Sequence, residues 1–190
     1  MKKIIYILFI MFCYITVSQN TYVHQVLLLN EGCYDYYEEE ILEPVTVGVY
    51  NPDDNSYNSV IEINGARFAS DLVIYGDYFY VAADNKLLKY DLNTYDLLMS
   101  QDVPGIRNIA IYENYLFITK GDYDLSSFSS VIFESYLDVY DTSDLSYLFS
   151  FDTNNGPQWS TESLLIQNNT LYIGINNAYD YGNYKGIVGV

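Results

Sequence analysis

Two short patterns recur in order along this 190-residue chain, and this repetition constrains the fold more than any other feature. The first pattern is an alternating apolar segment, a turn rich in Gly, Asp and Asn, and a second alternating segment, which together predict a β-hairpin. It occurs at Leu72–Val81, Ile109–Ile118 and Leu164–Ile173. The second pattern is a short apolar strand that ends in Tyr-Asn or Tyr-Asp, followed by a polar turn and another apolar run. It occurs at Val47–Asn51, Leu87–Asp91 and Leu137–Asp141.

The tyrosines of the second pattern are spaced 40 and 50 residues apart. Spacing near 40 with about four strands per unit is typical of a β-propeller blade, so we predict an all-β propeller of four-stranded antiparallel blades. A β-sandwich is the alternative, because many short strands with regular turns also fit it. The expected units are 23–65, 68–103, 106–153 and an incomplete 163–190. Because the last unit stops in mid-pattern, we expect the N-terminal portion, about three and a half blades, of a larger propeller.

The N-terminal segment has the three parts of a secretory signal. Lys2 and Lys3 are basic, residues 4–14 are almost entirely apolar, and Thr16 and Ser18 are small residues that suit cleavage before residue 19. We therefore predict a signal peptide over 1–18, with an uncleaved anchor as the alternative. The mature chain would then be secreted, periplasmic or on the cell surface, with no transmembrane span after cleavage.

The composition excludes several classes of protein. The net charge is −17, and it becomes −19 once Lys2 and Lys3 are removed, which argues against nucleic-acid binding. Half of the residues are hydrophobic and 23 are tyrosine, so the chain should fold. His24 is the only histidine, which leaves little room for histidine-based catalysis. Cys33 is the only cysteine of the predicted mature chain, and we expect it to be buried.

One part of the sequence resembles a known propeller family. Ile106–Ile111 followed by Leu116–Lys120 resembles the YVTN-type repeat, with looser copies at 80–83 and 172–175, and Leu27–Gly32 resembles the first blade of exported bacterial surface propellers. The resemblance implies a WD40-like arrangement of four-stranded blades. It also implies a relation to lactonase-like propellers, some of which are enzymes.

Catalytic signatures do not support an enzyme, and we assign no catalytic residue. The sequence contains no G-x-S-x-G, no H-E-x-x-H, no P-loop and no helix-opening G-x-G-x-x-G. The alternative function is a lactonase-like or other metal-assisted hydrolase with carboxylates at the central channel. Asp71, Asn108 and Glu162 lie just before their inner strands and would serve it.

Long connections rich in tyrosine and carboxylate residues mark the predicted binding face. Equivalent loops of a propeller emerge on one face, so these residues should converge there with two arginines and the only tryptophan. The ligand-binding candidates are Tyr34, Asp35, Tyr36, Arg67, Arg107, Asp122, Tyr123, Asp124, Trp159, Tyr179, Asp180 and Tyr181. Tyrosines with flanking carboxylates suit a glycan, whereas clustered carboxylates suit Ca²⁺ or a cationic surface protein. The competing interpretation is a set of solvated loops. No cofactor other than this calcium ion is expected.

The tyrosines inside the strands have a different expected role. We predict that they pack between blades. They are Tyr75, Tyr78, Tyr80, Tyr90, Tyr112, Tyr115, Tyr140 and Tyr172. Asn51, Asp91 and Asp141, which end the second pattern, should close turns by accepting hydrogen bonds from nearby backbone N–H groups.

Overall fold

The computed structural model describes residues 24–124, 126–127, 129–175 and 186–189. Within these ranges all helix and strand assignments are β, and every strand pairing is antiparallel. The predicted signal peptide, residues 1–18, lies outside the described part of the chain. Among the described residues there is no helix of the length and apolarity needed to cross a membrane.

Four sheets, which we call blades 1 to 4, follow one another along the chain. Blade 1 contains β1 (Val26–Asn30), β4 (Val45–Asn51) and β5 (Ser56–Ile63). Blade 2 contains β6 (Ala69–Tyr75), β7 (Tyr78–Ala83), β8 (Lys86–Asp91) and β9 (Leu97–Asp102). Blade 3 contains β10 (Ile106–Tyr112), β11 (Tyr115–Lys120), β14 (Ser135–Asp141) and β15 (Tyr147–Asp152). Blade 4 contains β16 (Thr161–Gln167), β17 (Thr170–Ile175) and β18 (Gly186–Gly189).

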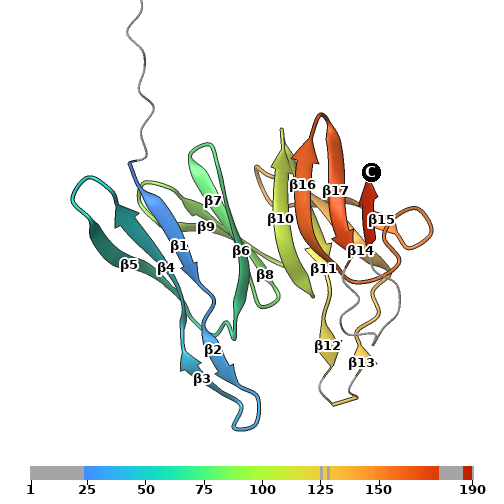
Figure 1. Ribbon diagram of the computed structural model, residues 1–190, viewed down its shortest axis with the longest axis horizontal. Helices are drawn as coiled ribbons and strands as arrows, with labels where there is room; N and C mark the ends of the chain where they lie inside the picture. Colours follow the sequence, from blue (N-terminus) through green and yellow to red (C-terminus); the bar gives the residue numbers. More distant parts are fainter. Residues whose placement is uncertain (1–23, 125, 128, 176–185, 190) are drawn as a thin grey trace, which may run out of the picture.

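Two extra hairpins interrupt blades 1 and 3. The first hairpin is β2 (Cys33–Asp35) with β3 (Glu40–Glu43), between β1 and β4. The second hairpin is β12 (Tyr123–Asp124) with β13 (Ser129–Ser130), between β11 and β14. Both project toward the bottom of Figure 1, away from the row of blades. The expected all-β propeller-type fold is confirmed, and the two packed sheets of a β-sandwich are not what the strands form.

Tight turns join the paired strands where the sequence predicted them. Gly76 and Glu113 have φ values of +61° and +54° between β6 and β7 and between β10 and β11. Asn168 and Asn169, between β16 and β17, have φ values of +52° and +59°. Positive φ at these places matches the turns that suit the twist of a β-hairpin, and Gly and Asn adopt it at little steric cost.

The expected turn-closing side chains are also confirmed. Asn51 Oδ1 accepts a hydrogen bond from Asp53 N at 2.9 Å. Asp91 Oδ1 accepts from the backbone N–H groups of residues 93 and 94 at 2.8 and 2.9 Å, and Asp141 Oδ1 accepts from Ser143 N at 2.7 Å. Each carboxylate or amide replaces a backbone acceptor within the turn that follows the third strand position.

Three apolar clusters lie between successive blades. The first joins residues such as Val45 and Val47 of blade 1 to Phe79 and Val81 of blade 2. Tyr80 and other residues of the opposite face of blade 2 contact blade 3 in the second cluster, and the third joins blades 3 and 4. Alternate residues of one strand therefore face the preceding and the following blade, as the period-two pattern requires.

Polar contacts reinforce the contact between blades 2 and 3. Lys89 is buried, and its Nζ donates hydrogen bonds to the carbonyl oxygens of Thr142 and Ser143 at 2.8 and 3.0 Å. Tyr80 Oη donates to the carbonyl of Thr142 at 3.0 Å. Burial lowers the pKa of Lys89 and raises the pKa of Tyr80 to about 12, so the Tyr80 hydroxyl keeps its proton and remains a donor at neutral pH.

The structure corrects two expectations for blade 1. Cys33 is exposed rather than buried, because the connection that carries it folds as a projecting hairpin. β1, expected as the innermost strand of its unit, holds the second strand position instead. Val26 pairs with Tyr50 in the register in which Phe79 pairs with Tyr90 in blade 2.

The strand tyrosines divide into two groups. Tyr80, Tyr90 and Tyr140 are buried in the contacts between blades, as expected. Five others are between 36 and 41% exposed, so the packing expectation is wrong for them. They are Tyr75, Tyr78, Tyr112, Tyr115 and Tyr172. The first four flank the hairpin turns at the ends of β6, β7, β10 and β11, where the sheet faces are less completely covered.

Candidate ligand-binding cleft between two hairpins

A cleft of about 510 Å³ lies where the first and second hairpins approach each other. The two hairpins form neighbouring projections in Figure 1, with the starts of β6 and β10 between them. The lining residues come from the two hairpins, from the connection between blades 1 and 2, and from β10. They are Tyr36, Arg67, Phe68, Arg107, Asp122, Tyr123, Asp124, Ser126 and Val131. The fold thus gathers six of the sequence-predicted candidates in one concave site, with aromatic, cationic and anionic groups together.

Arg67 is held on several sides. The Asp84 carboxylate accepts hydrogen bonds from Arg67 Nε, at 3.1 Å to each oxygen, and from Nη2. The guanidinium carbon lies 5.9 Å from the ring centroid of Tyr34 and 5.5 Å from that of Phe68, within cation–π range. The hydrogen-bonded Asp84 carboxylate raises the pKa of Arg67. The side chain therefore presents a fixed cation at the cleft.

Arg107 provides the second cation and ties the cleft to blade 4. Its Nη2 lies 3.0 Å and its Nε 3.3 Å from Glu162 Oε1. Its carbonyl oxygen accepts a hydrogen bond from Ser70 Oγ at the start of blade 2. Arg107 therefore connects three successive blades, and its partner Glu162 begins the inner strand of blade 4.

The second hairpin supplies two carboxylates and one ring. Asp122 Oδ1 accepts a hydrogen bond from Tyr123 N at 2.7 Å, and the Asp122 carbonyl accepts one from Val131 N at 3.0 Å. Asp124 accepts hydrogen bonds from Ser126 N, Ser126 Oγ and Ser127 Oγ at 2.7 to 2.8 Å. These hydrogen bonds, the one from the Ser126 side chain foremost, lower the pKa of Asp124 to about 2. Asp124 therefore stays ionised.

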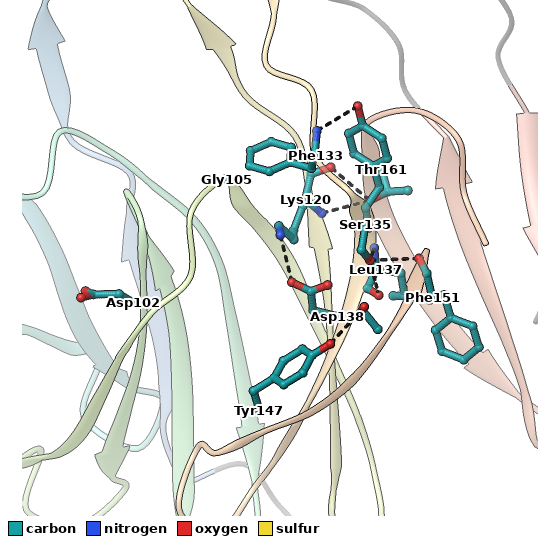
Figure 2. Close-up of polar contacts among 12 residues, drawn as sticks. Asp102, Gly105, Lys120, Phe133, Ser135, Leu137, Asp138, Tyr147, Phe151 and Thr161 are labelled. Carbon is teal, nitrogen blue, oxygen red and sulfur yellow. Dashed lines mark hydrogen bonds and ion pairs between the residues drawn. The ribbon is translucent and has the colours of Figure 1, made fainter. Parts of the chain in front are cut away.

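A partly buried ion pair anchors the base of the second hairpin. Figure 2 shows Lys120 reaching Asp138, with Nζ and Oδ2 2.9 Å apart, beside the ring of Phe133 at 4.7 Å. Lys120 N donates to Thr161 Oγ1 at 3.0 Å, which joins the base of this hairpin to blade 4. Lys120 and Phe133 lie at the two ends of the segment that forms the hairpin, so both ends are fixed by these contacts.

The first hairpin holds its aromatic residues with a short turn. Asp35 Oδ1 accepts hydrogen bonds from Tyr37 N at 2.7 Å and Glu38 N at 3.1 Å, which fixes the chain reversal. Tyr34 and Tyr36 contact edge to face, with ring centroids 5.0 Å apart. Tyr34 thus stacks on Arg67 from one side while its neighbour Tyr36 lines the cleft.

The remaining candidates lie elsewhere. Asp35 has the turn-forming role just described, and Trp159 is half-buried in the connection between β15 and β16 without lining the cleft. Tyr179, Asp180 and Tyr181 lie outside the described residues. Sequence reasoning missed Ser126 and Val131 as lining residues and Asp84 as the partner of Arg67. The long connection before β14 marked the first two, but no local signal marked the third.

The residues considered for a hydrolase have structural partners. Asp71 Oδ2 accepts a hydrogen bond from Ile109 N at 2.8 Å and so joins blades 2 and 3. Asn108 N donates to Thr119 Oγ1, and Glu162 pairs with Arg107. In the part of the chain that the structure describes, no three His, Cys, Asp or Glu side chains are grouped to hold a metal ion.

A second cavity, of about 240 Å³, lies between blades 3 and 4. Its lining is almost entirely aromatic and aliphatic, and several of its residues belong to the apolar cluster between these blades. The lining residues are Tyr112, Tyr115, Phe117, Phe149, Phe151, Ile166, Asn169 and Leu171. We interpret it as incomplete packing between two blades, and it offers fewer polar groups for recognition than the cleft between the hairpins.

Comparisons with known proteins agree with the propeller-type architecture. A model of the LVIVD repeat, a family of β-propeller repeats, matches residues 66–89 and 106–126, which lie in blades 2 and 3. No curated protein matches the chain.

Two solved structures resemble the fold. One is Kuenenia stuttgartiensis hydrazine synthase, with a TM-score of 0.59 and 12% identity over 76% of this chain and 39% of that one. The other is the extracellular domain of a putative one-component system from B. thetaiotaomicron, with a TM-score of 0.51 and 17% identity over 78% of this chain and 19% of that one. The chain therefore spans less than half of either structure, and at these identities the likeness concerns the fold alone.

Proposed function

We propose that this chain is an exported propeller-type binding module that holds a neutral glycan in the cleft between its two hairpins. The observation that carries the proposal is the convergence of Tyr36, Phe68 and Tyr123 with charged side chains from three separate segments. Sugar rings offer apolar faces that stack on aromatic rings, and hydroxyl groups that exchange hydrogen bonds with carboxylates and guanidinium groups.

The charges around the cleft favour a neutral ligand over an anionic one. Arg67 and Arg107 are each paired with a carboxylate, Asp84 and Glu162 respectively. Two further carboxylates, Asp122 and Asp124, line the cleft. Four carboxylates around two guanidinium groups leave a net negative environment, which repels phosphorylated, sulfated or acidic ligands.

Two observations support an extracytoplasmic location. The sequence begins with a basic and then apolar segment typical of a signal peptide. One of the structures with a similar fold is an extracellular domain. The YVTN-type likeness of residues 106–120 also fits exported bacterial propellers, although the family model that matches is the LVIVD repeat. A secreted or surface position would bring the cleft into contact with cell-wall or environmental glycans.

The proposal is tested with an array of neutral oligosaccharides that includes β-1,4-glucan, mannan and galactan fragments. We expect the purified chain to bind at least one of them, and the double variant Tyr36→Ala/Tyr123→Ala to bind it about tenfold more weakly, since each stacking ring contributes roughly 0.5–1.5 kcal/mol. Isothermal titration of the best array ligand gives the two dissociation constants.

Tyr37→Ala is the matched control for this experiment. Tyr37 lies on the same hairpin as Tyr36, is 97% exposed and does not line the cleft, so its removal should leave the affinity unchanged. Equal loss in Tyr37→Ala and in the double variant would overturn the assignment of the site. Selective binding of a basic protein, with no oligosaccharide bound, would overturn the glycan as the ligand.

A further inference from the structure

Each blade presents two faces that have fixed neighbours. The leading face, which carries Phe79 and Val81 in blade 2, packs on the preceding blade. The trailing face, which carries Val73 and Tyr80 in blade 2, packs on the following blade. The strand registers place Leu116 and Ile118 of blade 3 at the leading positions of Phe79 and Val81. All four of these leading residues are fully buried.

The leading face of blade 1 has the same pattern but is uncovered. By register, Val26 and Leu28 occupy the leading positions of Phe79 and Val81, and they are 38% and 43% exposed. β1 also forms one edge of its sheet, since the strand order among the described residues is β1-β4-β5. An apolar face beside an open strand edge is a surface that proteins normally cover.

The trailing face of blade 4 is the complementary surface. Leu165 and Tyr172 pair with each other and occupy the positions of Val73 and Tyr80 in blade 2. They are 57% and 40% exposed, whereas Tyr80 is buried against blade 3. The two open faces lie toward opposite ends of the row of blades in Figure 1.

We infer that the trailing face of blade 4 in one copy packs against the leading face of blade 1 in a second copy. The contact would continue the pattern of the three blade–blade interfaces already present in the chain, with Leu165 and Tyr172 set against Val26 and Leu28. A two-fold axis makes this contact twice, which closes a ring of two copies. Two copies contribute eight sheets, which lies within the range of about four to eight blades that propellers use.

The strong negative charge of each copy opposes this association at low ionic strength. The apolar faces drive it, so salt should favour it. Sedimentation velocity of the purified chain at tens of micromolar should therefore show a dimer whose fraction rises between 0.02 and 0.5 M NaCl. A reducing agent is needed because the exposed Cys33 could otherwise link copies covalently.

Two face variants test the geometry. Leu28→Asp and Tyr172→Asp should each sediment as a monomer, because each removes one member of both contacts. An equimolar mixture should recover a dimer, because the intact trailing face of the first variant meets the intact leading face of the second. Leu97→Asp, on the outer strand β9, is the matched control and should behave as wild type.

Three outcomes would overturn the inference. They are a wild-type monomer at all salt concentrations, a dimer that survives either face variant, and a mixture that stays monomeric although both variants keep the wild-type circular dichroism spectrum. Loss of the dimer in Leu28→Asp alone would indicate instead that two leading faces meet.

Discussion

Replacing Asp138 with alanine should lower the free energy of unfolding by about 3–5 kcal/mol, because it leaves Lys120 as a charge without its partner in a partly buried site. The Lys120 and Asp138 side chains are only 12% and 9% exposed, and they lie 2.9 Å apart. Urea unfolding of the variant and the wild type, followed by circular dichroism, measures the difference. Loss of under 1 kcal/mol would show that Lys120 finds water or another partner.

The double variant Lys120→Ala/Asp138→Leu is the informative companion. Blade 2 has Ala83 and Leu88 at the positions that Lys120 and Asp138 occupy in blade 3, so the fold already accepts an apolar pair there. Replacing a buried ion pair by apolar residues is often neutral or stabilising. We expect the double variant to recover most of the stability lost in Asp138→Ala. If it is as unstable as the single variant, packing rather than the stranded charge explains the loss.

Replacing Phe79 with alanine should cost about 3–5 kcal/mol of stability, as is typical of buried Phe→Ala substitutions. Phe79 is fully buried between blades 1 and 2 and stacks on Tyr90, with ring centroids 5.0 Å apart and an interplanar angle of 11°. The change would leave a cavity in the largest contact of blade 2 with its preceding blade.

The control for Phe79→Ala is Tyr75→Ala, on the neighbouring strand. Tyr75 is exposed at the hairpin turn, so this substitution should change the unfolding free energy by only about 0.5 kcal/mol. Chemical denaturation of the three proteins under one set of conditions compares them. Similar losses in both variants would mean that blades 1 and 2 do not share the apolar contact described above.

Much of the fold could be predicted because its signals are local. The turns at Gly76 and Asn168–Asn169 have residues that adopt positive φ, and the alternation of apolar residues marks both faces of each blade. The same repetition identified the connections that carry the cleft residues. Arg67 and Arg107 were found because each lies at a start of a repeat unit, where the connections between blades emerge.

The rest depends on contacts between distant segments. Nothing in the sequence near Asp84 indicates that it pairs with Arg67, 17 residues away, because that pairing follows from the approach of two loops. Cys33 was expected to be buried, since the pairing of β2 with β3 is a choice that the short polar strands specify only weakly. The displacement of β1 by one strand position likewise became visible only in the pairing of Val26 with Tyr50.

The central claim is that two hairpins from different blades hold one ligand between them. Amide hydrogen exchange, measured with and without a saturating concentration of the best-binding neutral oligosaccharide, tests it most directly. We predict slower exchange in both residues 33–43 and residues 121–131 on binding, with the outer strands β5, β9 and β15 unchanged. Protection confined to one hairpin, or to the apolar cavity between blades 3 and 4, would contradict the claim.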